Sequence, residues 1–344
     1  MLPFTNDYLA YLLENPDYQK PAEGRLSDDS RVRLLGAGAI EIIPARVSSP
    51  QKVIVLSAGV HGNETAPVEW LNQLLNDLIN EELRLVHPLL LLFGHPLAMI
   101  AGQRELDHNL NRLFNGAYRD GDSIEHRRAA ELETWLDYFY LEYPGRRYHY
   151  DLHTAIRKSV HEKFAVVPYM PNRPYHLDQL NFLQHCGVDC LLFFHQPTTT
   201  FSYHSALNYQ ADAFTVELGQ VHPFGQNDLT RLWVLDQSMR QLLSREELVL
   251  EPLNLRRCQW YQVTDVINRE QSDFKLNFAH DLPNFTEFNS QDVVAFQANR
   301  EVIVVDGPKG VVFPNAHVQV GQRAAILVKV MSTEQCIQFI DRNQ

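Results

Sequence analysis

The sequence is short of three features that mark particular classes of protein: basic residues, paired cysteines and long apolar runs. Its 30 lysines and arginines stand against 42 aspartates and glutamates, which gives a formal net charge of −12. A nucleic-acid or membrane-surface partner needs a basic face, so this balance argues against both kinds of partner. A small anionic ligand is compatible with the sequence wherever arginines gather locally.

Cysteine usage and hydropathy indicate the compartment. The four cysteines form no C-x-x-C pair and are few for a disulfide framework, so buried thiols are expected. No apolar run reaches the roughly 18 residues of a membrane-spanning helix. The first residues show neither the basic region nor the apolar stretch of a secretory signal. We therefore expect a cytoplasmic protein, and its 45% hydrophobic content supports a sizeable core.

The most informative stretch is 53–78, where a strand pattern passes through a short turn into a helix pattern. The apolar run at 53–56 predicts a buried strand, and apolar residues then recur at helical spacing at 68, 71, 74, 75 and 78. His61 and Glu64 lie on the turn between them. Open parallel sheets bind ligands at the carboxyl ends of their strands, so this pair predicts a zinc site. An isolated H-x-x-E pair is more often simply solvated.

Two later strand ends supply further groups for such a site. A strand predicted over 147–154 brings His153 to its end, where it would complete three protein ligands and leave a fourth position for water. Asp151 either orients a ligand ring or faces solvent. A strand over 211–218 carries Glu217, which we interpret as the base that accepts a proton from the attacking water. A capping or salt-bridging glutamate is the alternative.

A long polar stretch, 94–116, follows another apolar strand. It shows little periodicity and carries Arg104, Asn111 and Arg112. Long loops inside compact domains tend to serve function, so we expect this loop to contribute to the site. The alternative is a hydrated surface loop whose arginines pair with neighbouring acidic residues.

The overall pattern predicts an α/β region followed by a β-rich region. Up to about residue 248, apolar runs alternate with helical patterns, whereas short alternating runs separated by turn signals follow. We therefore predict a catalytic α/β domain at 1–248 and a smaller β-domain at 249–344. Helices are expected at 8–14, 125–143, 177–185 and 227–247. Strands of the α/β domain are expected at 39–43, 53–57, 87–93, 147–154, 164–168, 191–195 and 211–218.

Four segments, in this order, resemble the succinylglutamate desuccinylase and aspartoacylase family, which is similar to the zinc carboxypeptidases. They read GVHGNETAP, RELDHNLNR, DLHTAIR and FTVELG and lie between residues 59 and 219. The resemblance implies a zinc-carboxypeptidase-like mixed sheet flanked by helices, with a smaller C-terminal β-domain. It also implies an amide hydrolase with one zinc ion per chain.

The resemblance assigns roles to individual residues. It implies that His61, Glu64 and His153 bind zinc, as the strand-end positions also predict. It makes Glu217 the general acid/base and Arg104 the group that polarises the scissile carbonyl. Fixed positive charge is what a developing oxyanion requires.

Substrate-binding residues follow from the same resemblance. Asn111 and Arg112 match the pair that holds a substrate carboxylate, which a guanidinium binds in bidentate fashion. Arg157 and Lys158, just after the third ligand, are further candidates because the implied substrate is strongly anionic. Aspartoacylases have a C-terminal tyrosine that reaches the substrate. The corresponding region here offers Phe313, so no such residue is expected.

The implied reaction is cleavage of N-succinyl-L-glutamate to succinate and L-glutamate, the last step of the arginine succinyltransferase route. One alternative is deacylation of another N-acyl amino acid, such as N-acetylaspartate. Another is a protein that binds acidic metabolites through zinc without turnover. Such a binder needs no base beside its metal ligands, so Glu217 favours the hydrolase. The expected partner is a small anionic substrate, with neither nucleic acid nor membrane.

Overall fold

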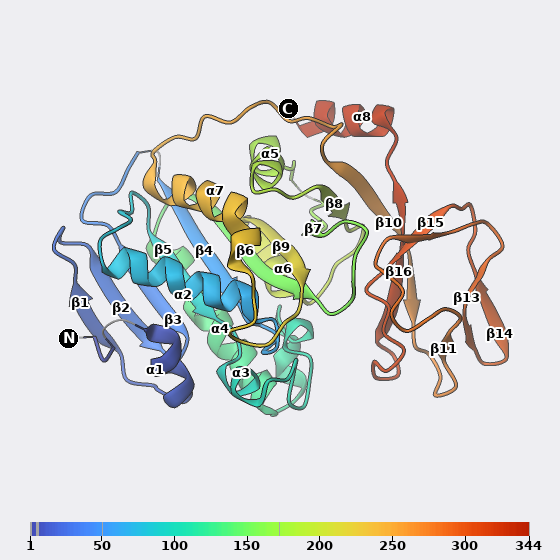
Figure 1. The fold of residues 1–344 in the computed structure, drawn as a ribbon, viewed down its shortest axis with the longest axis horizontal. Coiled ribbons are helices and arrows are strands. Elements are labelled where there is room, and N and C mark those ends of the chain that lie inside the picture. The colour runs from blue at the N-terminus through green and yellow to red at the C-terminus, as the bar shows by residue number, and fades with distance from the viewer. Residues whose placement is uncertain (1, 5–6, 50, 172, 344) are drawn as a thin grey trace.

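A large mixed sheet flanked by helices dominates the computed structural model, which describes residues 2–4, 7–49, 51–171 and 173–343. Within these residues the strands form a 13-stranded sheet and a 3-stranded sheet (Figure 1). The larger sheet has the order β1-β2-β3-β5-β4-β6-β9-β7-β8-β10-β16-β15-β12. The predicted fold class, a mixed sheet with flanking helices and a smaller C-terminal β-domain, is confirmed.

The strands and helices have the following bounds. The strands up to residue 220 are β1 (Ala22–Arg25), β2 (Arg31–Gly36), β3 (Ala39–Ile43), β4 (Lys52–Ala58), β5 (Leu89–Phe93), β6 (Arg146–Ala155), β7 (Lys163–Val167), β8 (Cys190–Phe193) and β9 (Asp212–Gln220). The helices are α1 (Tyr8–Glu14), α2 (Thr65–Ile79), α3 (Pro96–Ala101), α4 (Ile124–Glu142), α5 (Leu177–His185), α6 (Phe201–Tyr209), α7 (Trp233–Ser244) and α8 (Thr333–Asn343).

The centre of the large sheet is parallel, and this places the site. Strand β4 pairs in parallel with β5 and β6, and β6 pairs in parallel with β9. Their carboxyl ends therefore meet at one edge of the sheet. In the register of β6 and β9, His153 lies directly opposite Glu217. The predicted βαβ unit is present as β4, α2 and β5.

Helices cover both faces of this sheet, and the side chains of β4 point alternately toward the two faces. Ile54 and Leu56 belong to a core shared with α2, α5 and α7. Val53 and Val55 belong to a second core, shared with α4 and α6. A central parallel strand is apolar on both faces because each face is covered, which explains the unbroken apolar run in the sequence.

The C-terminal β-domain continues the large sheet. Strand β10 pairs in parallel with β8 and antiparallel with β16, so the sheet passes from the α/β part into this domain without a break (Figure 1). The boundary predicted between residues 248 and 249 stays a prediction. The remaining strands are β10 (Gln259–Asn268), β11 (Lys275–Leu276), β12 (Thr286–Phe288), β13 (Val293–Gln297), β14 (Arg300–Ile303), β15 (Lys309–Val312) and β16 (Arg323–Val330).

Several local predictions were wrong or incomplete. Residues 96–101 form helix α3 where a continuous loop was expected, because His95 caps its first turn, Pro96 suits the first helical position and Gly102 adopts the left-handed conformation that ends it. Helix α8 was missed, and its Phe339 packs against Trp260 of β10. Strands β1 and β2 and helix α6 were also missed.

The cysteines and the helices can be compared with what the sequence predicted. All four cysteines are free and buried, as predicted. Among the described residues, no helix combines the length and the apolar character needed to cross a membrane.

Candidate active site

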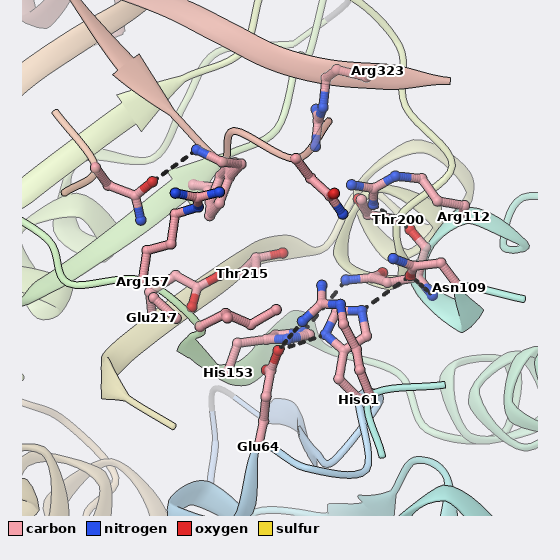
Figure 2. A pocket seen from close by; sticks show the side chains of 18 of the residues that line it. His61, Glu64, Asn109, Arg112, His153, Arg157, Thr200, Thr215, Glu217 and Arg323 are labelled. Carbon is pink, nitrogen blue, oxygen red and sulfur yellow. Dashed lines mark hydrogen bonds and ion pairs between the residues drawn. The ribbon is translucent and has the colours of Figure 1, made fainter. Parts of the chain in front are cut away.

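Three side chains converge at the carboxyl ends of β4 and β6 as a candidate metal site. Glu64 Oε1 lies 2.8 Å from His61 Nδ1, and Glu64 Oε2 lies 2.8 Å from His153 Nδ1. All three residues are buried, and the potential ligand atoms lie within 4.8 Å of one another. Figure 2 shows the Glu64 carboxylate reaching toward both imidazoles. The structure therefore brings together the three ligands that the sequence predicted.

The turn after β4 is shaped by two glycines. A Cβ atom on Gly62 would lie 2.2 Å from the carbonyl carbon of Ala98 in α3, so no other residue fits there without a shift. Gly59 has a φ of +69° and is packed against Met99 of the same helix. Glu64 occupies the N-cap position of α2 but makes no capping hydrogen bond. Its carboxylate is directed into the site instead.

The outer ring nitrogens of both histidines are engaged, which directs the inner ones at Glu64. Nε2 of His61 donates to Asn109 Oδ1 at 3.0 Å, and Nε2 of His153 donates to Asp151 Oδ2 at 3.0 Å. This leaves the Nδ1 lone pairs facing carboxylate oxygens, an arrangement that needs a proton or a cation between them. His61 Nδ1 has no hydrogen-bond partner of proper geometry. The donor set and its supporting groups therefore fit a zinc ion.

The charges of two of the three residues in this cluster already suit metal ligation. Burial raises the pKa of Glu64, but His61, His153 and Arg104 together hold it well below its usual range, so the carboxylate is ionised. Burial lowers the pKa of His61 to about 4. A neutral imidazole and an ionised carboxylate are the forms that bind a metal. Burial lowers the pKa of His153, but the carboxylates of Asp151 and Glu64 outweigh it and raise this pKa well above its usual range, so a metal ion would displace a proton from this imidazole.

Glu217 faces the same cavity from β9. Its side chain is buried, and Oε2 has no hydrogen-bond partner. Burial, followed by the nearby Glu64 carboxylate, raises the pKa of Glu217 to about 7. A carboxyl group with a pKa near neutrality can both accept and release a proton at physiological pH.

The loop after β5 supplies three more of the predicted residues. Arg104 donates from Nη1 to Glu64 Oε1 at 2.5 Å, so it lies directly beside the candidate metal ligands. The side-chain oxygen of Asn111 accepts from the Phe201 N–H at 2.9 Å, which fixes this amide at the start of α6. Arg112 lines the cavity, and its Nη1 donates to the Asn111 carbonyl at 2.7 Å.

Of the two basic residues predicted after His153, only one lines the cavity. Arg157 lines the cavity, and its Nη1 is buried without a hydrogen-bond partner. Lys158 is exposed and does not line the cavity. Both residues lie beyond the end of β6, which is Ala155.

Comparison with known proteins identifies the family. The catalytic domain described as succinylglutamate desuccinylase/aspartoacylase matches residues 50–243, and the AstE/AspA barrel-sandwich hybrid domain matches residues 256–331. The chain belongs to the succinylglutamate desuccinylase/aspartoacylase family. It is therefore a hydrolase of this family, as the sequence predicted. The zinc ion, the substrate and the roles of single residues stay predictions at this point.

Individual relatives are similar over nearly the whole length. A succinylglutamate desuccinylase of Shewanella piezotolerans is 44% identical over 331 residues, covering 94% of this chain and 96% of that protein. The solved structure of a succinylglutamate desuccinylase from Vibrio parahaemolyticus is 33% identical with a TM-score of 0.87 and covers 96% of both chains. That from Chromobacterium violaceum is 37% identical with a TM-score of 0.84, covering 95% of this chain and 98% of the other.

The cavity also contains residues whose role the sequence did not predict. Asn109 lies inside the RELDHNLNR segment, so the motif itself was the available signal. Thr200 and Thr215 line the cavity from the start of α6 and from β9. Arg323 enters from β16 of the C-terminal β-domain. It belongs to none of the four motifs, and nothing in its local sequence separates it from a surface arginine.

One buried carboxylate holds the arginine-bearing loop in place. Glu125 Oε1 accepts hydrogen bonds from the backbone N–H groups of Leu106 at 2.8 Å and Asp107 at 3.1 Å, and from His95 Nε2 at 3.1 Å. Burial raises the pKa of Glu125, but these hydrogen bonds outweigh it and lower the pKa to about 2. The loop that carries Arg104 and Arg112 is thus tied to the first turn of α4.

Replacing this carboxylate should destabilise the fold. In Glu125→Ala two backbone N–H groups and one imidazole lose their acceptor, so the free energy of unfolding should fall by roughly 1–3 kcal/mol at pH 7. Because the folded-state pKa of Glu125 is depressed, the wild-type advantage should shrink as pH falls from about 4 toward 2. Urea unfolding followed by circular dichroism, repeated between pH 7 and pH 2, measures the loss of unfolding free energy and its dependence on pH. Glu142→Ala, at the exposed end of the same helix, is the control and should change little.

Proposed function

We propose that this chain is a zinc-dependent amide hydrolase that cleaves N-succinyl-L-glutamate to succinate and L-glutamate, the reaction that ends the arginine succinyltransferase route. The observation that carries the proposal is a complete His-Glu-His donor set beside Glu217, a buried carboxyl group whose pKa is near neutrality. A protein that only binds metabolites needs no such group. The names of the full-length relatives support the choice of substrate.

The metal would be held by Nδ1 of His61, the carboxylate of Glu64 and Nδ1 of His153. When bound, zinc supplies a Lewis acid that lowers the pKa of water toward roughly 7 and polarises a carbonyl group. Asp151 and Asn109 keep both imidazoles in the orientation that presents Nδ1 to the site.

Glu217 moves the proton in this proposal. It accepts a proton from the water that attacks the amide carbon, and later delivers this proton to the nitrogen of the departing glutamate. The carbon–nitrogen bond breaks as that nitrogen is protonated, so succinate and L-glutamate are the products. The pKa of about 7 suits both steps, since the group must exist in both forms.

Arginines bind and polarise the anionic substrate. Arg104 uses Nη1 for Glu64, so other N–H groups of its guanidinium are available to the carbonyl oxygen. Arg112 and Arg157 both line the cavity, and each is suited to a substrate carboxylate. Lys158 is left out of this proposal because it is exposed outside the cavity.

Hydrolysis assays on matched substrates test the proposal directly. Zinc-loaded protein should release amino acid from N-succinyl-L-glutamate, whereas N-acetyl-L-aspartate should be cut poorly. Treatment with a chelator should abolish the activity, and added zinc should restore it. Preferred cleavage of the acetyl compound would move the assignment to the aspartoacylase branch. A zinc-loaded protein that cuts neither substrate would contradict the proposed function.

The role of Glu217 is tested by an isosteric change. Glu217→Gln keeps the size of the side chain but cannot accept a proton, so turnover should fall by roughly 10²- to 10⁴-fold. Zinc content, measured on the same sample, should stay at one ion per chain because Glu217 is not a ligand. Near-normal turnover would remove Glu217 from the mechanism. Loss of zinc instead would make it a ligand.

The role of Arg112 is tested by truncation. Arg112→Ala removes a charge-assisted contact worth roughly 1.5–3 kcal/mol, so kcat/KM should fall about 10- to 150-fold. Arg119→Ala is the matched control, because Arg119 is exposed and does not line the cavity. A loss below about twofold for Arg112→Ala would exclude Arg112 from substrate binding.

A further inference from the structure

Arg323 is a half-buried cation that the catalytic scheme does not use. It is the first residue of β16, in the C-terminal β-domain, and its side chain lines the cavity. Figure 2 shows it reaching into the cavity from the side away from His61, Glu64 and His153. Burial alone lowers its pKa to about 10, which means that no carboxylate close by offsets the loss of water.

Among the described residues, Arg323 has neither an ion-pair partner nor a side-chain hydrogen bond. Its guanidinium lies over the ring of Phe194, 5.4 Å from the ring centre, in a cation–π contact. A guanidinium carries five N–H donors in a planar fork. These donors line the cavity without an acceptor from the described residues, so they are available to an anionic ligand.

Arg112 faces the same part of the cavity with a similar deficit. It has no ion-pair partner among the described residues, and its recorded hydrogen bond goes to the neutral carbonyl of Asn111. Burial, and next the positive charge of Arg323, lower the pKa of Arg112 well below its usual range. The two guanidinium groups therefore repel each other in a protein whose net charge is −12. An anion between them would relieve that repulsion and satisfy both sets of donors.

We propose that Arg323 binds a substrate carboxylate remote from the scissile amide, in concert with Arg112. This inference rests on the proposed function, because N-succinyl-L-glutamate offers three carboxylates of which Arg112 alone can hold only one in bidentate fashion. Arg112 belongs to the loop after β5, and Arg323 belongs to β16. The C-terminal β-domain thereby determines substrate selectivity and is more than a cover for the cavity.

Substrates that each lack one charge provide the test. The analogues are N-succinyl-L-glutamine, N-succinyl-L-isoglutamine and N-butyryl-L-glutamate, in which a different carboxylate is replaced by an amide or a methyl group. Arg323→Gln should lower kcat/KM for N-succinyl-L-glutamate by about 10- to 100-fold, mainly by raising KM. For one analogue the loss should be below about threefold, and that analogue identifies the carboxylate bound by Arg323. Equal losses on all four compounds would overturn the proposal.

Two further variants separate binding from folding. Arg323→Lys keeps the charge and should recover part of the lost efficiency on N-succinyl-L-glutamate. Arg300→Gln, an exposed arginine of the same domain, should behave as wild type. The Tm of Arg323→Gln should match or exceed that of the wild type, because a half-buried charge without an ion-pair partner has been removed. A lower Tm with no recovery by lysine would indicate a purely structural role.

A binding measurement distinguishes failure of this inference from failure of the proposed function. N-succinyl-L-glutamate is titrated calorimetrically into zinc-loaded Glu217→Gln, with and without Arg323→Gln. Weakening of Kd by about 10-fold or more supports the carboxylate site, even if the wild type does not hydrolyse the compound. An unchanged Kd, or no binding by the parent variant, overturns the inference about Arg323. Absence of hydrolysis by the wild type overturns only the proposed reaction.

Discussion

The architecture of the site depends on one buried carboxylate, that of Glu64, held between two imidazoles. Its two oxygens lie 2.8 Å from Nδ1 of His61 and Nδ1 of His153, and the Thr154 N–H and Arg104 also donate to it. A buried carboxylate is tolerated only with such compensation. The parallel pairing of β4 with β6 brings these groups together. A shift in the register of these two strands would therefore also remove the groups that compensate the buried charge of Glu64.

Positive charge is concentrated in the cavity of a protein that is acidic overall. Arg104 is neutralised by Glu64, but Arg112 and Arg323 are left without acidic partners among the described residues. Arg104 thus supports the candidate metal ligands, whereas Arg112 and Arg323 line the cavity without an ion-pair partner among the described residues. An acidic exterior and a cavity with unpaired guanidinium groups together favour a small, multiply charged anion over a polyanion, which would have to approach across the whole surface.

Prediction from the sequence placed residues correctly where they stand next to a strand that the sequence itself reveals. His61, Glu64, His153 and Glu217 each follow or end an apolar strand, so strand ends alone were enough to place them at one edge of the sheet. It failed where short elements depend on their neighbours. Helix α3 was expected to be loop, although His95 and Gly102 carried the capping signals, because a six-residue helix shows almost no periodicity.

From the sequence alone it was possible to predict the central strands that carry the site, the four-motif resemblance to the family and the three candidate metal ligands. These features are encoded within single segments by apolar periodicity and residue type. Only the tertiary structure decided that Glu125 ties down the arginine loop, that Arg157 faces the cavity while Lys158 does not, and that Arg323 enters it from the second domain. Each depends on contacts between segments that are separate in the sequence, and for Arg323 the pairing of β8 with β10 joins its domain to the sheet of the site.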